Sequence, residues 1–241
     1  MGFPDHFSGH AALYAASRPT YPEHLIAELA ALVPGHEQAW DVGTGNGQAA
    51  QHLARHFEHV FASDASAAQI AEATPVPGVT FAVEPAERCS LPDHSVDLIL
   101  AAQCFHWFDH PAFFAEARRV LRPGGLFAAI GYGWWYVDDA VDTILATLLK
   151  RLEPHWAPGN WLLIDGYRAI DVPGAEVRVP PAAIHLRWER AQVEAYVLSW
   201  SVVQRLGTEV TDDCFEQLRV AWPDGQKRQV TMPIAVRASR L

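Results

Sequence analysis

Strand-like and helix-like segments alternate along this chain from about residue 22 to residue 153. Short apolar runs bounded by turn residues predict strands, and apolar residues at helical spacing predict the helices between them. We expect strands over 38–42, 58–63, 79–83, 95–102 and 125–131, and helices over 22–33, 47–57, 66–73, 111–121 and 137–152. This alternation predicts a mainly parallel sheet with crossover helices on both faces.

The first expected strand runs into the sequence DVGTGNG, in which Gly43, Gly45 and Gly47 follow Asp41 at alternate positions. Glycine at a strand-to-helix turn lets the backbone adopt positive φ, and it lets a ligand approach because no Cβ stands in the way. A dinucleotide fingerprint requires G-x-G-x-x-G, and a phosphate-binding P-loop ends in G-K-[S/T]. The spacing here is G-x-G-x-G with no lysine after it, which disfavours both phosphate-binding motifs.

Composition narrows the class of partner. The formal net charge is −10 and no run of lysine or arginine is present, which argues against a nucleic-acid surface. Cys89, Cys104 and Cys214 are an odd number of cysteines in scattered positions, so we expect free thiols in a reducing cytoplasm. The N-terminal sequence lacks the features of a signal peptide, and no apolar run approaches the roughly 18 residues of a membrane span. We therefore expect a cytoplasmic protein without a nucleic-acid or membrane partner.

Acidic residues follow the expected strands at the edge where a ligand would bind. In an open parallel sheet, ligands bind outside the carboxyl ends of the strands. Asp64 ends the second strand, 21 positions after Gly43, where a carboxylate can accept hydrogen bonds from ribose hydroxyls. The alternative role for Asp64 is to cap the helix that follows. Glu84 and Glu87 follow the third strand, and QCFHWFDH at 103–110 follows the fourth.

This series resembles the class I S-adenosylmethionine-dependent methyltransferases, in particular the type 11 group that includes trans-aconitate methyltransferase-like enzymes. The resemblance is carried by YAASRPTYP, DVGTGNG, SDAS, AERCSLPDHSVDLI, and HWFD followed by RVLRPGG. These sequences occur in the family's order over residues 7–135, whereas the last hundred residues match only loosely. The resemblance implies an enzyme that transfers a methyl group from S-adenosylmethionine to a small molecule, by O- or N-methylation, with a carboxylate oxygen as one candidate acceptor.

The resemblance also implies which residues contact the cofactor. The glycine turn would meet the methionine portion, Asp64 the ribose, and Glu87 the exocyclic amine of adenine. Gln103 would lie beside the methionine portion or beside the acceptor. The expected cofactor-binding residues are Tyr14, Arg18, Asp41, Gly43, Thr44, Gly45, Gly47, Asp64, Ala65, Ala86, Glu87 and Gln103. Besides Asp64, two of them have plain structural alternatives, because Glu87 would also suit a solvated loop and Arg18 would also suit the cap of a surface helix.

The acceptor side is expected around the fourth and fifth strand ends. His106 has a side chain that can act as a base near neutral pH, and it can equally be a wall residue of the pocket. Trp107, Trp134 and Trp135 are the expected substrate contacts, although packing between the sheet and a cap explains such aromatic residues equally well. Methyl transfer mainly requires orientation and the exclusion of water, so a catalytic triad is not needed.

Two groups of histidines have spacing close to that of metal ligands: His106 with His110, and His52 with His56 and His59. Pro111 disfavours the presentation of the first pair on one helical face. The second group would lie on the polar face of a crossover helix. No cysteine or carboxylate completes either set, so we expect no metal site.

The resemblance implies an α/β, Rossmann-like sheet of seven strands, mainly parallel, with an antiparallel last strand and a helical cap. We expect residues 1–136 to form the cofactor-binding core with an N-terminal lid segment. Residues 137–222 would form a mostly helical substrate cap with one strand at 183–188. Residues 223–241, with the turn PDG and an apolar run, would return to the core beside the fifth strand. The expected assembly is a monomer or homodimer.

Two functions from other classes stay open at this point. A nicotinamide-dependent oxidoreductase would use the same sheet, although the glycine spacing disfavours it. A catalytically silent S-adenosylmethionine-binding module would use the same cofactor residues and act through a partner. Binding measurements with S-adenosylhomocysteine and with NAD distinguish a methyltransferase from the oxidoreductase. Turnover measurements distinguish it from the silent module.

Overall fold

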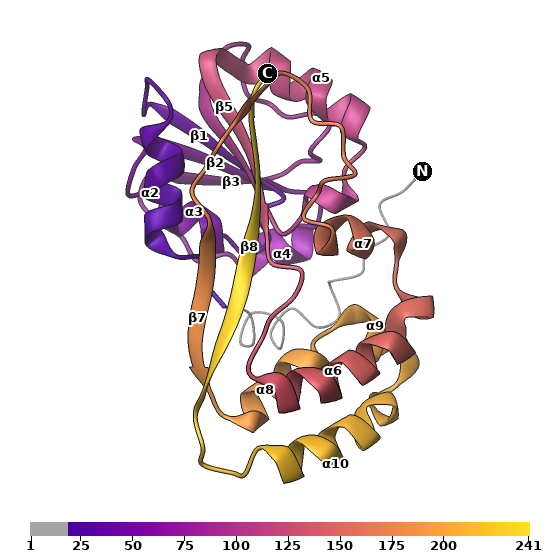
Figure 1. The fold of residues 1–241 in the computed structure, drawn as a ribbon. Helices are drawn as coiled ribbons and strands as arrows, with labels where there is room; N and C mark the ends of the chain where they lie inside the picture. The colour runs from indigo at the N-terminus through magenta and orange to yellow at the C-terminus, as the bar shows by residue number, and fades with distance from the viewer. Residues whose placement is uncertain (1–18) are drawn as a thin grey trace.

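The computed structural model describes residues 19–241. Seven strands form a sheet in the order β3-β2-β1-β4-β5-β8-β6, and β7 pairs with β8 off this path (Figure 1). The strands are β1 (Gln38–Val42), β2 (His59–Asp64), β3 (Val79–Val83), β4 (Val96–Ala102), β5 (Leu121–Gly131), β6 (Ala175–Val177), β7 (Ala182–Trp188) and β8 (Arg228–Arg240).

Strand directions confirm the expected fold class. β1 to β5 run parallel, and β8 runs antiparallel beside β5, as the terminal apolar run predicted. β8 also pairs with β6 and, through its first half, with β7. β6 was not predicted because its three residues are too few to show a periodic pattern. The largest difference in a strand boundary is that β5 begins at Leu121 and not at 125, because Leu121 pairs with Val96 ahead of a shift in register.

The helices occur where helical spacing predicted them in the first 153 residues. The α-helices of residues 19–241 are α2 (Glu23–Ala31), α3 (Gln48–Leu53), α4 (Ala67–Ala71), α5 (His110–Val120), α6 (Asp139–Leu152), α7 (Pro158–Ile164), α8 (Arg190–Leu198), α9 (Ser201–Leu206) and α10 (Asp212–Ala221). Asp109 caps α5 by accepting a hydrogen bond from the amide of Ala112, and Pro111 lies in its first turn. None of the helices in residues 19–241 is long and apolar enough to cross a membrane.

Helices cover both faces of the sheet, as expected. Leu98 and Leu100 of β4 lie in a buried cluster with residues of α2 and α3. Ile99 and Ala101 of the same strand point to the opposite face and pack with residues of α5. β4 is buried on both faces, which explains why its sequence, VDLILAA, is apolar apart from Asp97.

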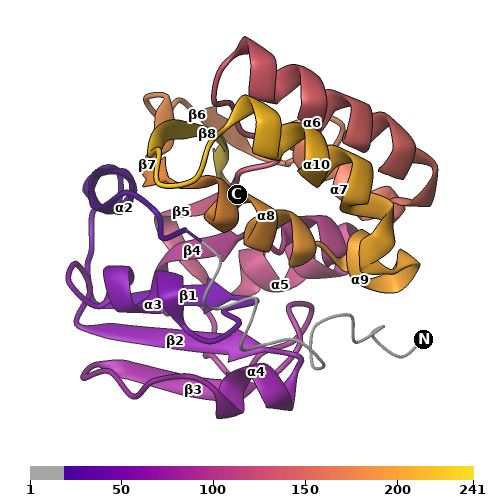
Figure 2. The ribbon, with the colours of Figure 1, turned by 90° about the horizontal axis from the view of Figure 1, so that it is seen from below.

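The helices after β5 gather at one end of the molecule. Seen from below, α6, α8, α9 and α10 lie together beyond the sheet (Figure 2). Trp135 is only 1% exposed, and its ring lies edge-on to that of Tyr196 in α8 with the centroids 6.1 Å apart. Trp134 lies partly buried against the same cluster and contacts Trp200. These two tryptophans therefore pack the helices against the sheet.

Candidate functional site

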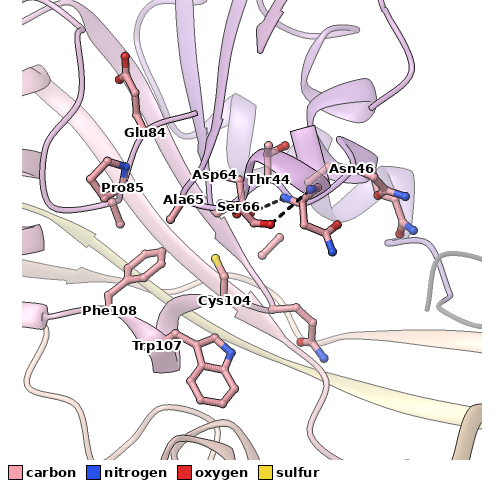
Figure 3. Close-up of a pocket in the computed structure, with 18 of the residues that line it drawn as sticks. Thr44, Asn46, Asp64, Ala65, Ser66, Glu84, Pro85, Cys104, Trp107 and Phe108 are labelled. Atoms are coloured by element: carbon pink, nitrogen blue, oxygen red, sulfur yellow. Dashed lines mark hydrogen bonds between the residues drawn. The ribbon is translucent and has the colours of Figure 1, made fainter. Parts of the chain in front are cut away.

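A cavity of about 680 Å³ lies at the carboxyl ends of the parallel strands (Figure 3). Its walls are the glycine turn after β1, the residues that follow β2, β3 and β4, and the start of α5. This is the edge at which an open parallel sheet binds its ligands. The volume falls within the range of about 300–1,000 Å³ that is typical of small-molecule sites.

Most of the predicted site residues meet at this cavity. Those that line it are Gly43, Thr44, Gly45, Asp64, Ala65, Ala86, Glu87, Gln103 and Trp107. Those that do not line it are Asp41, Gly47, His106, Trp134 and Trp135. Tyr14 and Arg18 lie outside the described residues. The predicted set thus divides into a cavity wall and residues packed behind it.

The glycine turn shows why each glycine is needed. Gly43, Gly45 and Gly47 have φ of 67°, 58° and 90°. A Cβ on Gly43 would lie 2.7 Å from Sγ of Cys104, and one on Gly47 would lie 2.8 Å from the ring of Phe81. A Cβ on Gly45 would meet nothing closer than 3.6 Å. Two of the glycines therefore permit close packing, whereas Gly45 leaves the cavity wall open.

Asp64 connects the end of β2 to the glycine turn. Its Oδ2 accepts a hydrogen bond from the amide of Gly45 at 2.9 Å, and its Oδ1 accepts one from the amide of Ser66 at 2.8 Å (Figure 3). Ser66, and not Asp64, caps α4, because its side chain accepts a hydrogen bond from the amide of Gln69. The carboxylate therefore lies on the cavity wall between the two turns.

Asp41 supports the turn from beneath. It is fully buried, and its Oδ2 accepts a hydrogen bond from the hydroxyl of Thr44, which does line the cavity. Burial raises the pKa of Asp41 to about 7, although hydrogen bonds from Thr44 and from the amide of Ala50 act in the opposite direction. Asp41 thus affects the cavity through the shape of the turn.

The wall after β3 and β4 combines acidic and aromatic side chains. Glu87 accepts a hydrogen bond through Oε1 from the amide of Asp109, 3.0 Å away. The thiol of Cys104 donates to the carbonyl of Val42, and burial raises the pKa of this thiol well above its usual range. Phe108 completes this side of the cavity (Figure 3). A neutral thiol and an aromatic ring give an apolar surface that faces the carboxylates.

The charge of the cavity wall is negative. Its carboxylate side chains are Asp64, Glu84, Glu87 and Asp109. Within residues 19–241, no lysine or arginine lines the cavity. A concave surface with carboxylates of one sign favours a ligand with positive charge.

His106 lies behind the wall. It belongs to the short helix Phe105–Trp107 and is 8% exposed. Its ring lies against that of Tyr167 with the centroids 6.2 Å apart, and a Cβ on Gly159 of α7 would lie 2.9 Å from its carbonyl oxygen. α7 therefore packs closely over this segment.

The histidines that were considered as metal ligands lie on different elements and make different contacts. Nε2 of His110 lies 3.0 Å from the carbonyl oxygen of Phe105. His52 lies on α3, where burial lowers its pKa, and His59 begins β2. In the described part of the chain, no three histidine, cysteine, aspartate or glutamate side chains come together as metal ligands do.

Several residues of the wall were not among the predicted site residues, namely Tyr21, Asn46, Ser66, Gln69, Pro85, Phe108 and Tyr132. Asn46 lies inside the glycine motif, and Phe108 lies in the segment after β4, so position after a strand was a usable signal for both. Tyr21 and Tyr132 reach the cavity from the segment before α2 and from the end of β5. Tyr21 lies in the sequence YAASRPTYP and Tyr132 directly follows the fifth strand, so each of them also carried a usable signal.

Known proteins match both the glycine-turn region and the whole fold. A family model for a methyltransferase domain of type 11 matches residues 40–129. A solved structure of a candidate type II methyltransferase from Anaeromyxobacter dehalogenans is 41% identical, with a TM-score of 0.86. That match covers 92% of this chain and 97% of the other. A candidate methyltransferase from Anabaena variabilis, at 16% identity and a TM-score of 0.58, shares the fold.

Curated relatives match part of their own length. A candidate methyltransferase of Dictyostelium discoideum is 33% identical over 174 residues, which cover 68% of this chain and 65% of that protein. A methyltransferase of uncharacterised activity from Mycobacterium tuberculosis is 32% identical over 139 residues, which cover 57% of this chain and 55% of that protein. The chain therefore spans between half and two thirds of the length of these two relatives.

Proposed function

The chain belongs to the class I S-adenosylmethionine-dependent methyltransferases, and on that basis we propose that it methylates an oxygen or nitrogen atom of a small molecule. The observation that carries the proposal is the position of Asp64. Its carboxylate and the open backbone at Gly45 share one wall of a cavity large enough for a small-molecule site.

The described residues fit the proposed donor. S-adenosylmethionine supplies an electrophilic methyl group on a positively charged sulfonium. The cavity wall is acidic, which suits a cationic ligand. Gly45 leaves room beside the turn, and the thiol of Cys104 and the ring of Phe108 provide an apolar surface. The charge of the cavity wall, the room beside Gly45 and the apolar surface therefore all fit S-adenosylmethionine.

In this proposal the chain binds the donor in a fixed orientation and keeps water away from the reacting atoms. Asp64 accepts hydrogen bonds from the ribose hydroxyls, and Glu87 accepts one from the adenine amine. Trp107 and Phe108 keep water from the reacting atoms. Alignment in a dry site lowers the barrier without a covalent step on the protein, so no nucleophilic side chain is required.

The charge of the cavity wall bears on whether a carboxylate acceptor can bind. The trans-aconitate group would predict a carboxylate acceptor, and such an acceptor needs a cationic side chain near it. In residues 19–241 the wall supplies none, so Arg18, outside the described residues, is the candidate. Arg18→Gln should raise the KM for a carboxylate acceptor and leave that for a neutral acceptor unchanged. Equal effects on both would exclude Arg18 as the carboxylate-binding group.

We also propose a division of labour along the chain. Residues 1–136 form the donor-binding core, residues 137–222 form a mostly helical substrate cap, and residues 223–241 return to the core sheet. The protein would act in the cytoplasm as a monomer or homodimer. Limited proteolysis with and without S-adenosylhomocysteine tests the first division, because donor binding should protect sites within residues 1–136 first.

The experiment that tests the function is calorimetry followed by an acceptor screen. S-adenosylhomocysteine should bind and NAD should not, and NAD binding alone would refute the proposal. A metabolite library incubated with isotopically labelled donor should then give one compound with the donor's mass shift. Binding without any methylated product would favour a silent module that acts through a partner.

A further inference from the structure

The side chain of Gln103 joins the ends of β4 and β5. Its Nε2 donates a hydrogen bond to the carbonyl oxygen of Tyr132 at 3.0 Å, and its Oε1 accepts one from the amide of Tyr132 at 2.9 Å. The regular ladder ends with Ala102 opposite Ile130, after which the amide of Gln103 donates to the carbonyl of Ile130. The side-chain amide therefore replaces the next rung of the ladder.

This pairing depends on an unusual local backbone. Gln103 has a φ of 63°, in the left-handed region that non-glycine residues rarely adopt. Gly131 directly precedes Tyr132, and a Cβ there would come within 2.7 Å of Oε1 of Gln103 and of the hydroxyl of Tyr167. Glycine at this position therefore allows the amide to reach Tyr132.

The pair lies at the end of the cavity away from the proposed ribose site. Gln103 and Tyr132 both line the cavity, and the ring of Tyr132 lies 6.0 Å from that of Tyr21, another wall residue. Two strands separate β5 from β2, which ends at Asp64. Three strand spacings of about 4.8 Å place these strands roughly 14 Å apart. The β5 end of the cavity is thus available to the acceptor.

We propose that Gln103 is a positioning residue that fixes Tyr132 at the acceptor end of the cavity and so determines acceptor affinity. The inference rests on the proposed function, because that function assigns this end of the cavity to the acceptor. Of the two positions that the family resemblance implies for Gln103, it favours the one beside the acceptor. It adds the role of holding Tyr132, because both polar atoms of the Gln103 amide bond to that residue.

Two substitutions test the pairing. Gln103→Met keeps the length of the side chain and removes both hydrogen bonds. Gln103→Glu, when ionised, places a carboxylate oxygen against the carbonyl of Tyr132, whereas its protonated form has the O–H donor and carbonyl acceptor that the pairing needs. The matched control is Gln217→Met on the exposed face of α10.

The kinetic probe is the compound that gives the most methylated product in the labelled-donor screen. Both Gln103 variants should lower kcat/KM for it by about tenfold or more, mainly through KM, with the Kd of S-adenosylhomocysteine changed less than about threefold. Lowering the pH should restore the glutamate variant relative to wild type and should not restore the methionine variant. Weaker S-adenosylhomocysteine binding with an unchanged acceptor KM would overturn the acceptor assignment.

Hydrogen exchange gives a readout that needs no substrate. The amide of Tyr132 should exchange faster in Gln103→Met than in wild type, while amides within β4 should keep their protection. Unchanged exchange at Tyr132 would overturn the pairing. A wild-type chain that does not bind S-adenosylhomocysteine would refute the proposed function and the acceptor assignment, and the exchange result would still decide the pairing.

Discussion

The hydroxyl of Thr44 donates a hydrogen bond to the buried carboxyl of Asp41, and this contact joins the cavity wall to the end of β1. The amide of Ala50, in the first turn of α3, favours the ionised form of Asp41. Because burial raises the pKa of Asp41 to about 7, the group that supports the glycine turn changes its charge near neutral pH.

This pKa predicts how stability depends on pH. The folded protein holds the Asp41 proton up to about pH 7, whereas the unfolded chain loses it near its ordinary value of 3.8. The contribution of Asp41 to the free energy of unfolding is therefore greatest below pH 4 and falls as the pH rises to 7. At 1.36 kcal/mol for each pH unit, the fall amounts to about 4 kcal/mol.

Urea unfolding of Asp41→Asn at several pH values checks this prediction, because asparagine does not titrate. The difference in unfolding free energy between wild type and variant should shrink or change sign between pH 4 and 7. Asp171→Asn, at an exposed position, is the matched control and should follow wild type. Parallel pH curves for wild type and Asp41→Asn would contradict the raised pKa.

Asp64→Ala should weaken donor binding and preserve the fold. Removing a charged acceptor from two ribose hydroxyls costs about 1.5–3 kcal/mol, which corresponds to a loss of roughly 10- to 150-fold in affinity. Calorimetry with S-adenosylhomocysteine measures the loss, and circular dichroism checks the fold. Glu72→Ala, at the exposed end of α4, controls for the change in charge. A loss of less than threefold in Asp64→Ala would exclude the ribose contact.

The glycines should separate binding from stability. Gly45→Ala puts a methyl group on the cavity wall, so donor affinity should fall while stability drops by only about 1 kcal/mol for the positive φ. Gly47→Ala should cost about 1–3 kcal/mol more, because its Cβ meets the ring of Phe81.

Gly225→Ala is the control for the glycine series. Gly225 has a φ of 75°, and no atom lies within 4 Å of the site of an added Cβ. This variant should lose as much stability as Gly45→Ala and retain full donor affinity. If Gly45→Ala also retained full affinity, the turn would not contact the donor.

His106→Asn should cause a modest loss of turnover that does not depend on pH. The residue is buried behind the wall, so we expect it to shape the cavity. The pH profile of kcat from pH 5 to 9 is the measurement, and His24→Asn on the exposed face of α2 is the control. A fall of about 100-fold that grows smaller at high pH would identify His106 as a base instead.

The sequence by itself determined the parallel core and the location of the cavity. Apolar periodicity and turn chemistry are local properties, so they placed β1 to β4 and α2 to α6 to within about four residues. The glycine turn, Asp64 and Glu87 follow strand ends, and the parallel topology brings strand ends to one edge. Their positions directly after strand ends were therefore enough to predict that these residues lie close together.

Only the tertiary structure decided what each side chain faces. Gln103 bonds to Tyr132 across 29 positions of sequence, and the burial of Trp135 depends on α8, far along the chain. His106 lies behind the wall because α7 packs over it. Hydrogen bonds and packing between distant segments leave no periodic trace in either segment, so the division of the candidate residues into wall and support arises only when the chain has folded.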